Sequence, residues 1–238
     1  MNGTLIAATP HFIEQRWTEY TTENHRIWQM LFNRRTRELR GVAPQEFFDG
    51  LELLGLAEGE VPEFERVNAR LQKLTGWQVV AVDGFLESHV FFDCLAQRRF
   101  PSTVTLRTLK QLEYLPEPDI FHDIFGHVPL LACTAYADYV HRFGQKAAQS
   151  STPEELERSA RIFWFTVEFG LMGGQDKPQV YGSGLISSAA DAAHALSEKC
   201  DRRPFSMDAI LRQEFRTDEI QKVLFVIDSF EDLFGIDL

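Results

Sequence analysis

Apolar residues recur every three or four positions through most of the chain, with glycines and prolines between the runs. This spacing places an apolar stripe on an α-helix, so the chain is expected to be mostly helical. The pattern predicts helices over residues 22–41, 44–55 and 62–76, a helix that begins at residue 88, and a helix from residue 152 to about residue 171. Short β-branched runs predict strands over residues 77–82 and 223–227. We therefore expect one mostly α domain with a few short β-strands.

The helix predicted from residue 152 has the clearest beginning. Thr152 is placed to cap the first turn, Pro153 fits the first helical position, and Glu155 completes a capping box. The glycines at positions 173 and 174 are expected to follow its end.

The composition is that of an acidic globular protein. The chain has 238 residues, with 24 Lys+Arg against 35 Asp+Glu and a formal net charge of −11. This balance disfavours nucleic acid and anionic membrane surfaces as partners, because both require a basic patch. No apolar run approaches the roughly 20 residues of a membrane helix, and residues 1–8 lack the basic start of a signal peptide. Three widely spaced cysteines, Cys94, Cys133 and Cys200, suggest reduced thiols, and the expected location is the cytoplasm.

One carboxylate lies inside a very apolar stretch. Residues 162–172 are apolar on nearly every side of the predicted helix, which indicates burial all round, and Glu168 stands in their middle. A buried carboxylate costs several kcal/mol unless it is paired, protonated or bound to a metal. No basic residue stands three or four positions away, so its partner must come from elsewhere in the fold.

Two histidines, His122 and His127, lie inside a second apolar stretch. A single histidine there is most often a hydrogen-bonded core residue, but two of them together with a buried carboxylate favour a metal site. On a continuous α-helix, five positions turn the two side chains about 140° apart, too far to share one ion. Because Gly126 ends helices and Pro129 prevents their continuation, the helix is expected to stop near Phe125 and let His127 fold back toward His122.

Two neutral imidazoles and one carboxylate form the facial triad of non-haem Fe(II) oxygenases. Zinc is the competing metal, because the same donors also serve catalytic zinc. The zinc-protease motif HExxH needs histidines four apart with a glutamate after the first, whereas here they are five apart and Asp123 follows His122. The spacing favours iron, and it leaves open a zinc hydrolase and a non-catalytic binding protein whose histidines belong to the core.

Three long motifs are similar to those of one enzyme family. They cover residues 116–130, with both histidines, residues 164–171, with Glu168, and residues 181–188. With these motifs in this order, nearly the whole chain resembles the pterin-dependent aromatic amino acid hydroxylases. It is most similar to the short bacterial members, which hydroxylate phenylalanine.

The resemblance implies a domain organisation. Residues 1–238 would form a single catalytic domain with a loosely ordered N-terminal segment over residues 1–14, and with neither a regulatory domain nor a tetramerisation helix. The expected fold is that of the family's catalytic domain, mostly α with a few short β-strands around a non-haem iron site. The expected state is a monomer that acts on small molecules, with no nucleic acid or membrane partner.

The resemblance also implies a substrate site. Arg107 would grip the substrate carboxylate through its bidentate guanidinium. Trp164 would form a wall of the ring pocket, and Ser187 would help to bind the carboxylate and support the first iron-ligating histidine. Without the family, these residues would be interpreted as a surface charge, a core aromatic residue and a turn hydroxyl.

Residues 82–91 resemble the family's pterin loop. Backbone groups that would bond the edge of the pterin lie near Gly84, Leu86 and Ser88. Phe91 would stack on the pterin ring, and Asp123 stands where many members carry an acid close to the pterin. A strand, a turn and a helix with a core phenylalanine is the alternative for this segment.

The resemblance finally implies a monooxygenase in which His122, His127 and Glu168 hold Fe(II) and so carry the catalysis. Tetrahydrobiopterin, or a related tetrahydropterin, and O₂ would react at the iron, so that one oxygen atom enters the aromatic ring and the other enters the pterin. The expected reaction converts L-phenylalanine to L-tyrosine. The same chemistry on tryptophan or tyrosine, or at another ring position, is the alternative.

Overall fold

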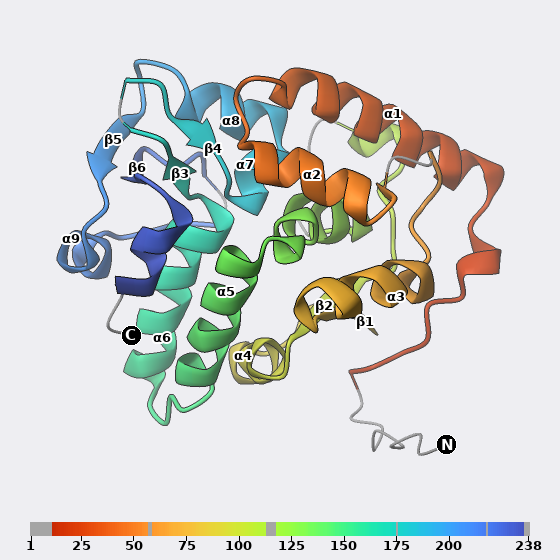
Figure 1. Cartoon of the computed structure of the whole chain (residues 1–238), viewed down its shortest axis with the longest axis horizontal. Coiled ribbons are helices and arrows are strands. Elements are labelled where there is room, and N and C mark those ends of the chain that lie inside the picture. Colours follow the sequence, from red (N-terminus) through yellow and green to blue (C-terminus); the bar gives the residue numbers. More distant parts are fainter. Residues whose placement is uncertain (1–10, 57–58, 113–117, 175, 218, 236–238) are drawn as a thin grey trace.

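Helices make up most of the computed structural model, which describes residues 11–56, 59–112, 118–174, 176–217 and 219–235 (Figure 1). The α-helices are α1 (Thr22–Leu39), α2 (Gln45–Leu53), α3 (Phe64–Thr75), α4 (Ser88–Ala96), α5 (Thr134–Ala147), α6 (Pro153–Phe163), α7 (Ser183–Ser187), α8 (Ala189–Ala195) and α9 (Met207–Arg212). The other helical segments are the π-helices η4 (Phe121–His127) and η6 (Trp164–Glu168) and the 3₁₀ helices η1 (Trp17–Glu19), η3 (Leu109–Gln111), η5 (Pro129–Ala132) and η7 (Phe230–Gly235). The mostly α fold class is confirmed.

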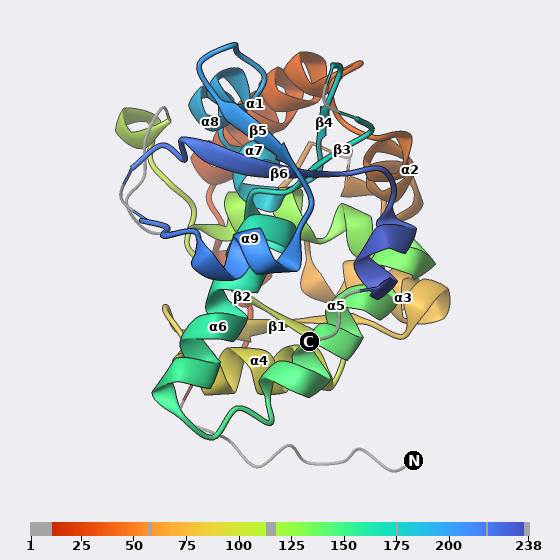
Figure 2. The same ribbon diagram turned by 90° about the vertical axis from the view of Figure 1, so that its left-hand side faces the viewer.

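The strands form two small sheets. They are β1 (Gln78–Val82), β2 (Arg99–Thr103), β3 (Leu171–Met172), β4 (Gln179–Val180), β5 (Asp201–Pro204) and β6 (Val223–Ile227). β1 and β2 pair in parallel, and the other four strands follow the order β4-β3-β6-β5. Figure 2 faces this four-stranded sheet, with α6 and α9 below it. β6 is the continuous apolar run predicted as a strand, and it pairs in parallel with both of its neighbours, as a buried strand does.

The predicted caps agree with the observed helix ends to within one or two residues. α1 is capped by Thr21, one position before the expected Thr22. α3 ends at Gly76, which has the left-handed φ of 76° that glycine adopts without strain. The capping box at the start of α6 is confirmed, because the Thr152 side chain accepts from the Glu155 backbone N–H.

The N-terminal segment joins the sheet of β1 and β2. Of the predicted loose segment, residues 1–10 lie outside the described residues. Phe12 pairs with Val82, and the Ile13 N–H donates to the Ala81 carbonyl over 3.0 Å. This pairing anchors the chain before it enters η1 and α1.

Aromatic side chains hold η4 between α1 and α2. The rings of Phe121 and Phe125 stack 4.7 Å apart within η4. Trp28 of α1 meets Phe121 edge-on at 5.3 Å, and Phe47 of α2 meets Phe125 at 5.4 Å. Such pairs stabilise a core beyond their burial, so η4 is fixed from both sides.

Among the described residues, no helix is both long and apolar enough to cross a membrane.

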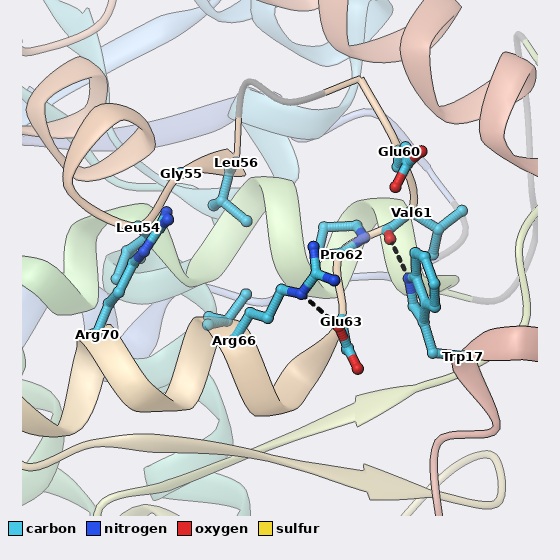
Figure 3. A pocket seen from close by; sticks show the side chains of 11 residues that line it. Trp17, Leu54, Gly55, Leu56, Glu60, Val61, Pro62, Glu63, Arg66 and Arg70 are labelled. Atoms are coloured by element: carbon cyan, nitrogen blue, oxygen red, sulfur yellow. Dashed lines mark hydrogen bonds and ion pairs between the residues drawn. The ribbon is translucent and has the colours of Figure 1, made fainter.

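The loop before α3 encloses a small hollow (Figure 3). The Trp17 indole N–H donates to the Val61 carbonyl over 2.6 Å, and Arg66 pairs with Glu63 at 2.6 Å while lying 5.7 Å from the Trp17 ring centre. The hollow measures about 40 Å³, which holds a few water molecules but not an amino acid or a pterin. The functional site lies elsewhere.

Candidate active site

His122 and His127 lie on one π-helical turn, η4. A π-helix bonds each residue to the one five positions away, so side chains five apart lie on the same side of the helix. The two imidazole centroids are 5.1 Å apart, and the rings are nearly perpendicular. The histidines therefore lie together as expected, but the predicted cause is wrong. The helical structure does not stop near Phe125; it continues as a π-helix through His127, and Pro129 then begins η5.

Glu168 reaches the histidines from a second π-helical turn. The α-helix α6 ends at Phe163, and η6 follows, with the Phe169 N–H donating over 2.9 Å to the carbonyl of Trp164 five residues earlier. The predicted end of this helix near residue 171 is wrong, because Leu171 already belongs to β3. The π turn rather than a continuous α-helix sets the direction of Glu168.

The donor atoms of these three residues converge. One carboxylate oxygen of Glu168 lies 3.1 Å from His127 Nε2, and the other lies 3.7 Å from His122 Nε2. All three donors lie within 4.8 Å of one another. The His127 side chain is 4% exposed, against 19% for His122 and 15% for Glu168, so the cluster is buried but can be reached from outside.

The protonation states of His122 and Glu168 suit a divalent metal ion. Burial lowers the pKa of His122 to about 4, so its imidazole is neutral at pH 7. Burial alone would raise the pKa of Glu168, but His127 and a hydrogen bond from Ser183 help to bring that pKa down to about 2. Two imidazole nitrogens and one carboxylate are the facial donor set of Fe(II). The residues present therefore fit an iron ion.

Two serines of α7 fix the orientation of the donors. Ser187 Oγ lies 2.9 Å from His122 Nδ1, and Ser183 Oγ donates to Glu168 Oε2 over 2.7 Å. With Nδ1 occupied by the hydroxyl, His122 directs Nε2 at the metal position. Sequence analysis expected Ser187 beside His122 but missed Ser183, although the motif over residues 181–188 contains it.

A glycine lets α7 come this close to η6. A Cβ atom on Gly182 would lie 2.4 Å from the carbonyl oxygen of Glu168 and 2.5 Å from the backbone nitrogen of Gly170. Real Cβ atoms do not approach backbone so closely. The side chain of residue 182 must therefore be absent if Ser183 is to reach Glu168.

Comparison with known proteins assigns the chain to a family. The family model for biopterin-dependent aromatic amino acid hydroxylases matches residues 13–234. The chain belongs to this family. The resemblance inferred from the three motifs is confirmed, and the zinc hydrolase and the non-catalytic binding protein are no longer alternatives.

Bacterial phenylalanine hydroxylases are among its relatives. The chain is 42% identical over 239 residues to the phenylalanine-4-hydroxylase of Caulobacter vibrioides, covering 100% of this chain and 81% of that protein. The crystal structure of Chromobacterium violaceum phenylalanine hydroxylase with iron(III) and 7,8-dihydrobiopterin has a TM-score of 0.91 at 41% identity, over 95% of this chain and 83% of that one. The structure of that enzyme with iron and phenylalanine has a TM-score of 0.88 at 40% identity, over 94% and 82%.

In this hydroxylase, the guanidinium of Arg107 is held by a carboxylate that sequence analysis missed. Asp119 accepts from Arg107 Nε at 2.9 Å and Nη2 at 2.8 Å, and it also accepts from the backbone N–H of His122 at 3.1 Å. The bidentate face of the guanidinium, which sequence analysis expected to face the substrate, thus faces Asp119, while Nη1 makes no hydrogen bond within the described residues. Asp119 stands three residues before His122 in an apolar run, so the argument used for Glu168 could have found it.

Trp164 opens the π turn that carries Glu168. Its half-buried ring packs against Phe169 at 4.6 Å and Phe215 at 5.2 Å between centroids. The indole nitrogen is buried and has no hydrogen-bond partner among the described residues. The aromatic face and Glu168 thus belong to one rigid turn.

The predicted pterin loop connects β1 to α4. Gly84 has a φ of 82° and open space around it, so its backbone conformation, not close packing, requires glycine. Gly84 and Ser88 are exposed, and Leu86 is half-buried. Phe91 meets Phe163 edge-on at 5.2 Å between centroids. Phe163 lies 6.3 Å from His127 and nearly parallel to it, so two ring contacts lead from Phe91 to the metal donors.

Asp123 faces away from solvent and toward β2. Its carboxylate accepts from the Thr103 backbone N–H at 2.7 Å and from the Thr103 hydroxyl at 3.1 Å. Burial raises the pKa of Asp123 to about 7, despite these hydrogen bonds. The side chain therefore ties η4 to β2.

Proposed function

We propose that this hydroxylase converts L-phenylalanine to L-tyrosine with Fe(II), tetrahydrobiopterin and O₂. The observation that carries the proposal is the convergence of His122, His127 and Glu168 within 4.8 Å in a protein of this family. The Chromobacterium violaceum enzyme, whose structures hold iron, dihydrobiopterin and phenylalanine, supports the substrate assignment.

Iron would be held by Nε2 of both histidines and by the Glu168 carboxylate. Iron(II) so bound, together with the tetrahydropterin, supplies the activation of O₂ that ring hydroxylation requires. The chain keeps the donors ready: Ser187 directs the His122 ring, and Ser183 holds one oxygen of Glu168. Because three protein donors lie on one face, the positions needed by O₂ and a co-substrate stay open.

Substrate orientation would come from residues beside the donors. The Nη1 edge of Arg107 is available for the substrate carboxylate, and Asp119 keeps the guanidinium from moving. Ser187 contributes to the same carboxylate, and Trp164 forms an aromatic wall beside Glu168. Together they would direct the phenyl ring at the open face of the iron and exclude water from it.

The pterin would lie against the loop between β1 and α4. Its ring would stack on Phe91, and η4 would carry Asp123, bonded to Thr103, close to the pterin. Backbone groups that would bond its donors and acceptors lie near the exposed Gly84 and Ser88 and the half-buried Leu86.

The substrate is tested by offering all three aromatic amino acids to one preparation. The protein is reconstituted with Fe(II) without oxygen, then given tetrahydrobiopterin, O₂ and phenylalanine, tryptophan or tyrosine, and the products are analysed by mass spectrometry. We expect tyrosine from phenylalanine as the fastest reaction, and none from the His122→Ala variant. Faster hydroxylation of tryptophan or tyrosine, or a product substituted elsewhere on the ring, would replace the proposed substrate or position.

We further propose that the enzyme works as a monomer in the cytoplasm. The free cysteines Cys94, Cys133 and Cys200 support a reducing compartment. The net charge of −11 supports small molecules rather than nucleic acid or a membrane as partners. Light scattering after gel filtration tests the state, and a mass of twice 27.4 kDa or more would reject the monomer.

A further inference from the structure

The short helix α7 holds two of the three iron donors. Ser183, at its first position, donates to Glu168 Oε2 over 2.7 Å, and Ser187, at its last position, lies 2.9 Å from His122 Nδ1. A shift of α7 would move both hydroxyls at once. Whatever fixes α7 therefore also fixes the directions of Glu168 and His122.

α7 cannot fix itself by its own hydrogen bonds. It has five residues, Ser183–Ser187, and a helix leaves the carbonyls of its last turn without partners inside the helix. Leu185 and Ile186 are buried, at 1% and 0% exposure, so water does not take these carbonyls. Buried carbonyls require a donor from another part of the chain.

Arg35 of α1 supplies that donor. Its Nε donates to the Ile186 carbonyl and its Nη2 to the Leu185 carbonyl, each over 3.0 Å. Its Nη1 pairs with Glu38 of the same helix at 2.6 Å. The residue is 4% exposed although it carries a charge, and α7 lies about 150 positions further along the chain. A rigid guanidinium with several donors suits two successive carbonyls and a carboxylate at the same time.

We propose that Arg35 is a positioning residue for the iron site. It holds the last turn of α7 so that Ser187 and Ser183 direct His122 and Glu168 at the metal. The inference rests on the proposed function, in which these side chains hold iron. Among the described residues, the hydrogen bonds of Arg35 go to α7 and to Glu38 rather than to the metal donors, so it acts through the two serines.

The test compares metal binding by the wild type with that of Arg35→Lys, Arg35→Met and the matched control Arg37→Met. Arg37 is an exposed arginine on the same helix. Cobalt(II) serves as the probe, because its visible absorption reports the number and arrangement of its ligands. Affinity and spectrum are measured by titration of the metal-free proteins, and circular dichroism verifies that each variant is folded.

We expect Arg37→Met to bind cobalt as the wild type does, and both Arg35 variants to bind it about 10-fold or more weakly, with an altered spectrum. Lysine keeps the charge near Glu38 but cannot reach both carbonyls with a planar fork. Ser187→Ala is added alone and together with Arg35→Lys. Because Arg35 acts through the serines, the two losses in affinity are expected not to add.

Several outcomes would contradict the proposal. A folded Arg35→Lys or Arg35→Met protein with wild-type cobalt affinity and spectrum would do so, and so would strictly additive losses with Ser187→Ala. If neither Arg35 variant folds, Arg35 is a structural residue and the positioning role is wrong. Failure of the proposed function has a different result: the wild type itself would not bind cobalt, or Glu168→Gln would bind it equally well.

Discussion

Glu168 is largely enclosed and yet ionised, and its neighbours explain its charge. Burial favours the protonated acid, but His127 at 3.1 Å and the Ser183 hydroxyl at 2.7 Å stabilise the carboxylate, and the pKa falls to about 2. The same contacts set the direction of each oxygen. A divalent ion thus meets a carboxylate that is already charged and oriented.

At the residue scale, Arg107→Ala tests the substrate assignment. A hydrogen bond to a charged group contributes about 1.5–3 kcal/mol, so the KM for phenylalanine is expected to rise about 10- to 100-fold, while the KM for the pterin changes little. Steady-state kinetics with each substrate varied in turn measures both. Arg37→Ala is the control, because Arg37 is an exposed arginine of α1 that has no assigned role in the site. Equal rises in the two KM values would contradict the assigned role.

How visible a functional residue is in the sequence depends on its surroundings. The sequence predicts His122, His127 and Glu168 as metal donors because each stands in an apolar run. A polar side chain buried there is costly unless it is hydrogen-bonded, paired or bound to a metal. Ser183 follows a glycine and looks like a turn hydroxyl. Arg35 lies on an amphipathic helix, where an arginine normally faces solvent, so only the folded chain reveals that it points inward to α7.

At the element scale, the two π-helical turns are what the sequence does not reveal. A capping box depends only on residues close together in the sequence, so Thr152 and Glu155 are enough to predict the start of α6. The change from α to π hydrogen bonding in η4 and η6 depends on packing from elsewhere in the chain, such as Trp28 and Phe47 against η4. Sequence analysis therefore found the donors but not the geometry that joins them.

The cap of α6 provides a test of stability separate from the site. Thr152 Oγ accepts from the Glu155 backbone N–H at 3.2 Å, and its loss in Thr152→Ala is expected to lower the free energy of unfolding by about 1 kcal/mol. Urea unfolding of the metal-free protein measures this. Iron affinity is expected to stay at the wild-type value, because the cap lies at the other end of α6 from η6. A large loss of iron affinity would show that the site depends on the whole helix.

The same cap predicts a pH dependence. Backbone and side-chain hydrogen bonds from Ser151 and a backbone hydrogen bond from Thr152 hold the pKa of Glu155 below its usual 4.5. A lowered carboxyl pKa means that this stabilisation is present above about pH 4.5 and is lost as the pH falls through the lowered value. Glu155→Gln is therefore expected to be less stable than the wild type at pH 7 and to approach it at low pH. Urea midpoints across pH measure the difference, and a constant gap would contradict the cap.

The close contact between α7 and η6 predicts a sensitive glycine. In Gly182→Ala the new Cβ atom would meet the Glu168 carbonyl oxygen at 2.4 Å, so one segment must move. Such overpacking typically costs about 1–3 kcal/mol, and here it would also displace Ser183 from Glu168. We expect a lower free energy of unfolding together with weaker iron binding. A folded variant with unchanged iron affinity would show that the Ser183 contact does not matter.

At the scale of the whole molecule, segments far apart in sequence form one site. α1 contributes Arg35, η4 the histidines, η6 the carboxylate, and α7 the serines that connect them. Buried phenylalanines link these segments: Phe163 contacts Phe91 and His127, so the loop between β1 and α4 comes within two ring contacts of the metal donors.

The central claim is that this site hydroxylates phenylalanine on iron held by His122, His127 and Glu168. It is tested most directly by supplying ¹⁸O₂ and tetrahydrobiopterin to the protein loaded with Fe(II) or with Zn(II), and to Glu168→Gln treated with Fe(II). The account predicts tyrosine with one ¹⁸O atom from the iron-loaded wild type alone. Labelled tyrosine from the zinc protein or from Glu168→Gln, or none from the iron-loaded wild type, would contradict it.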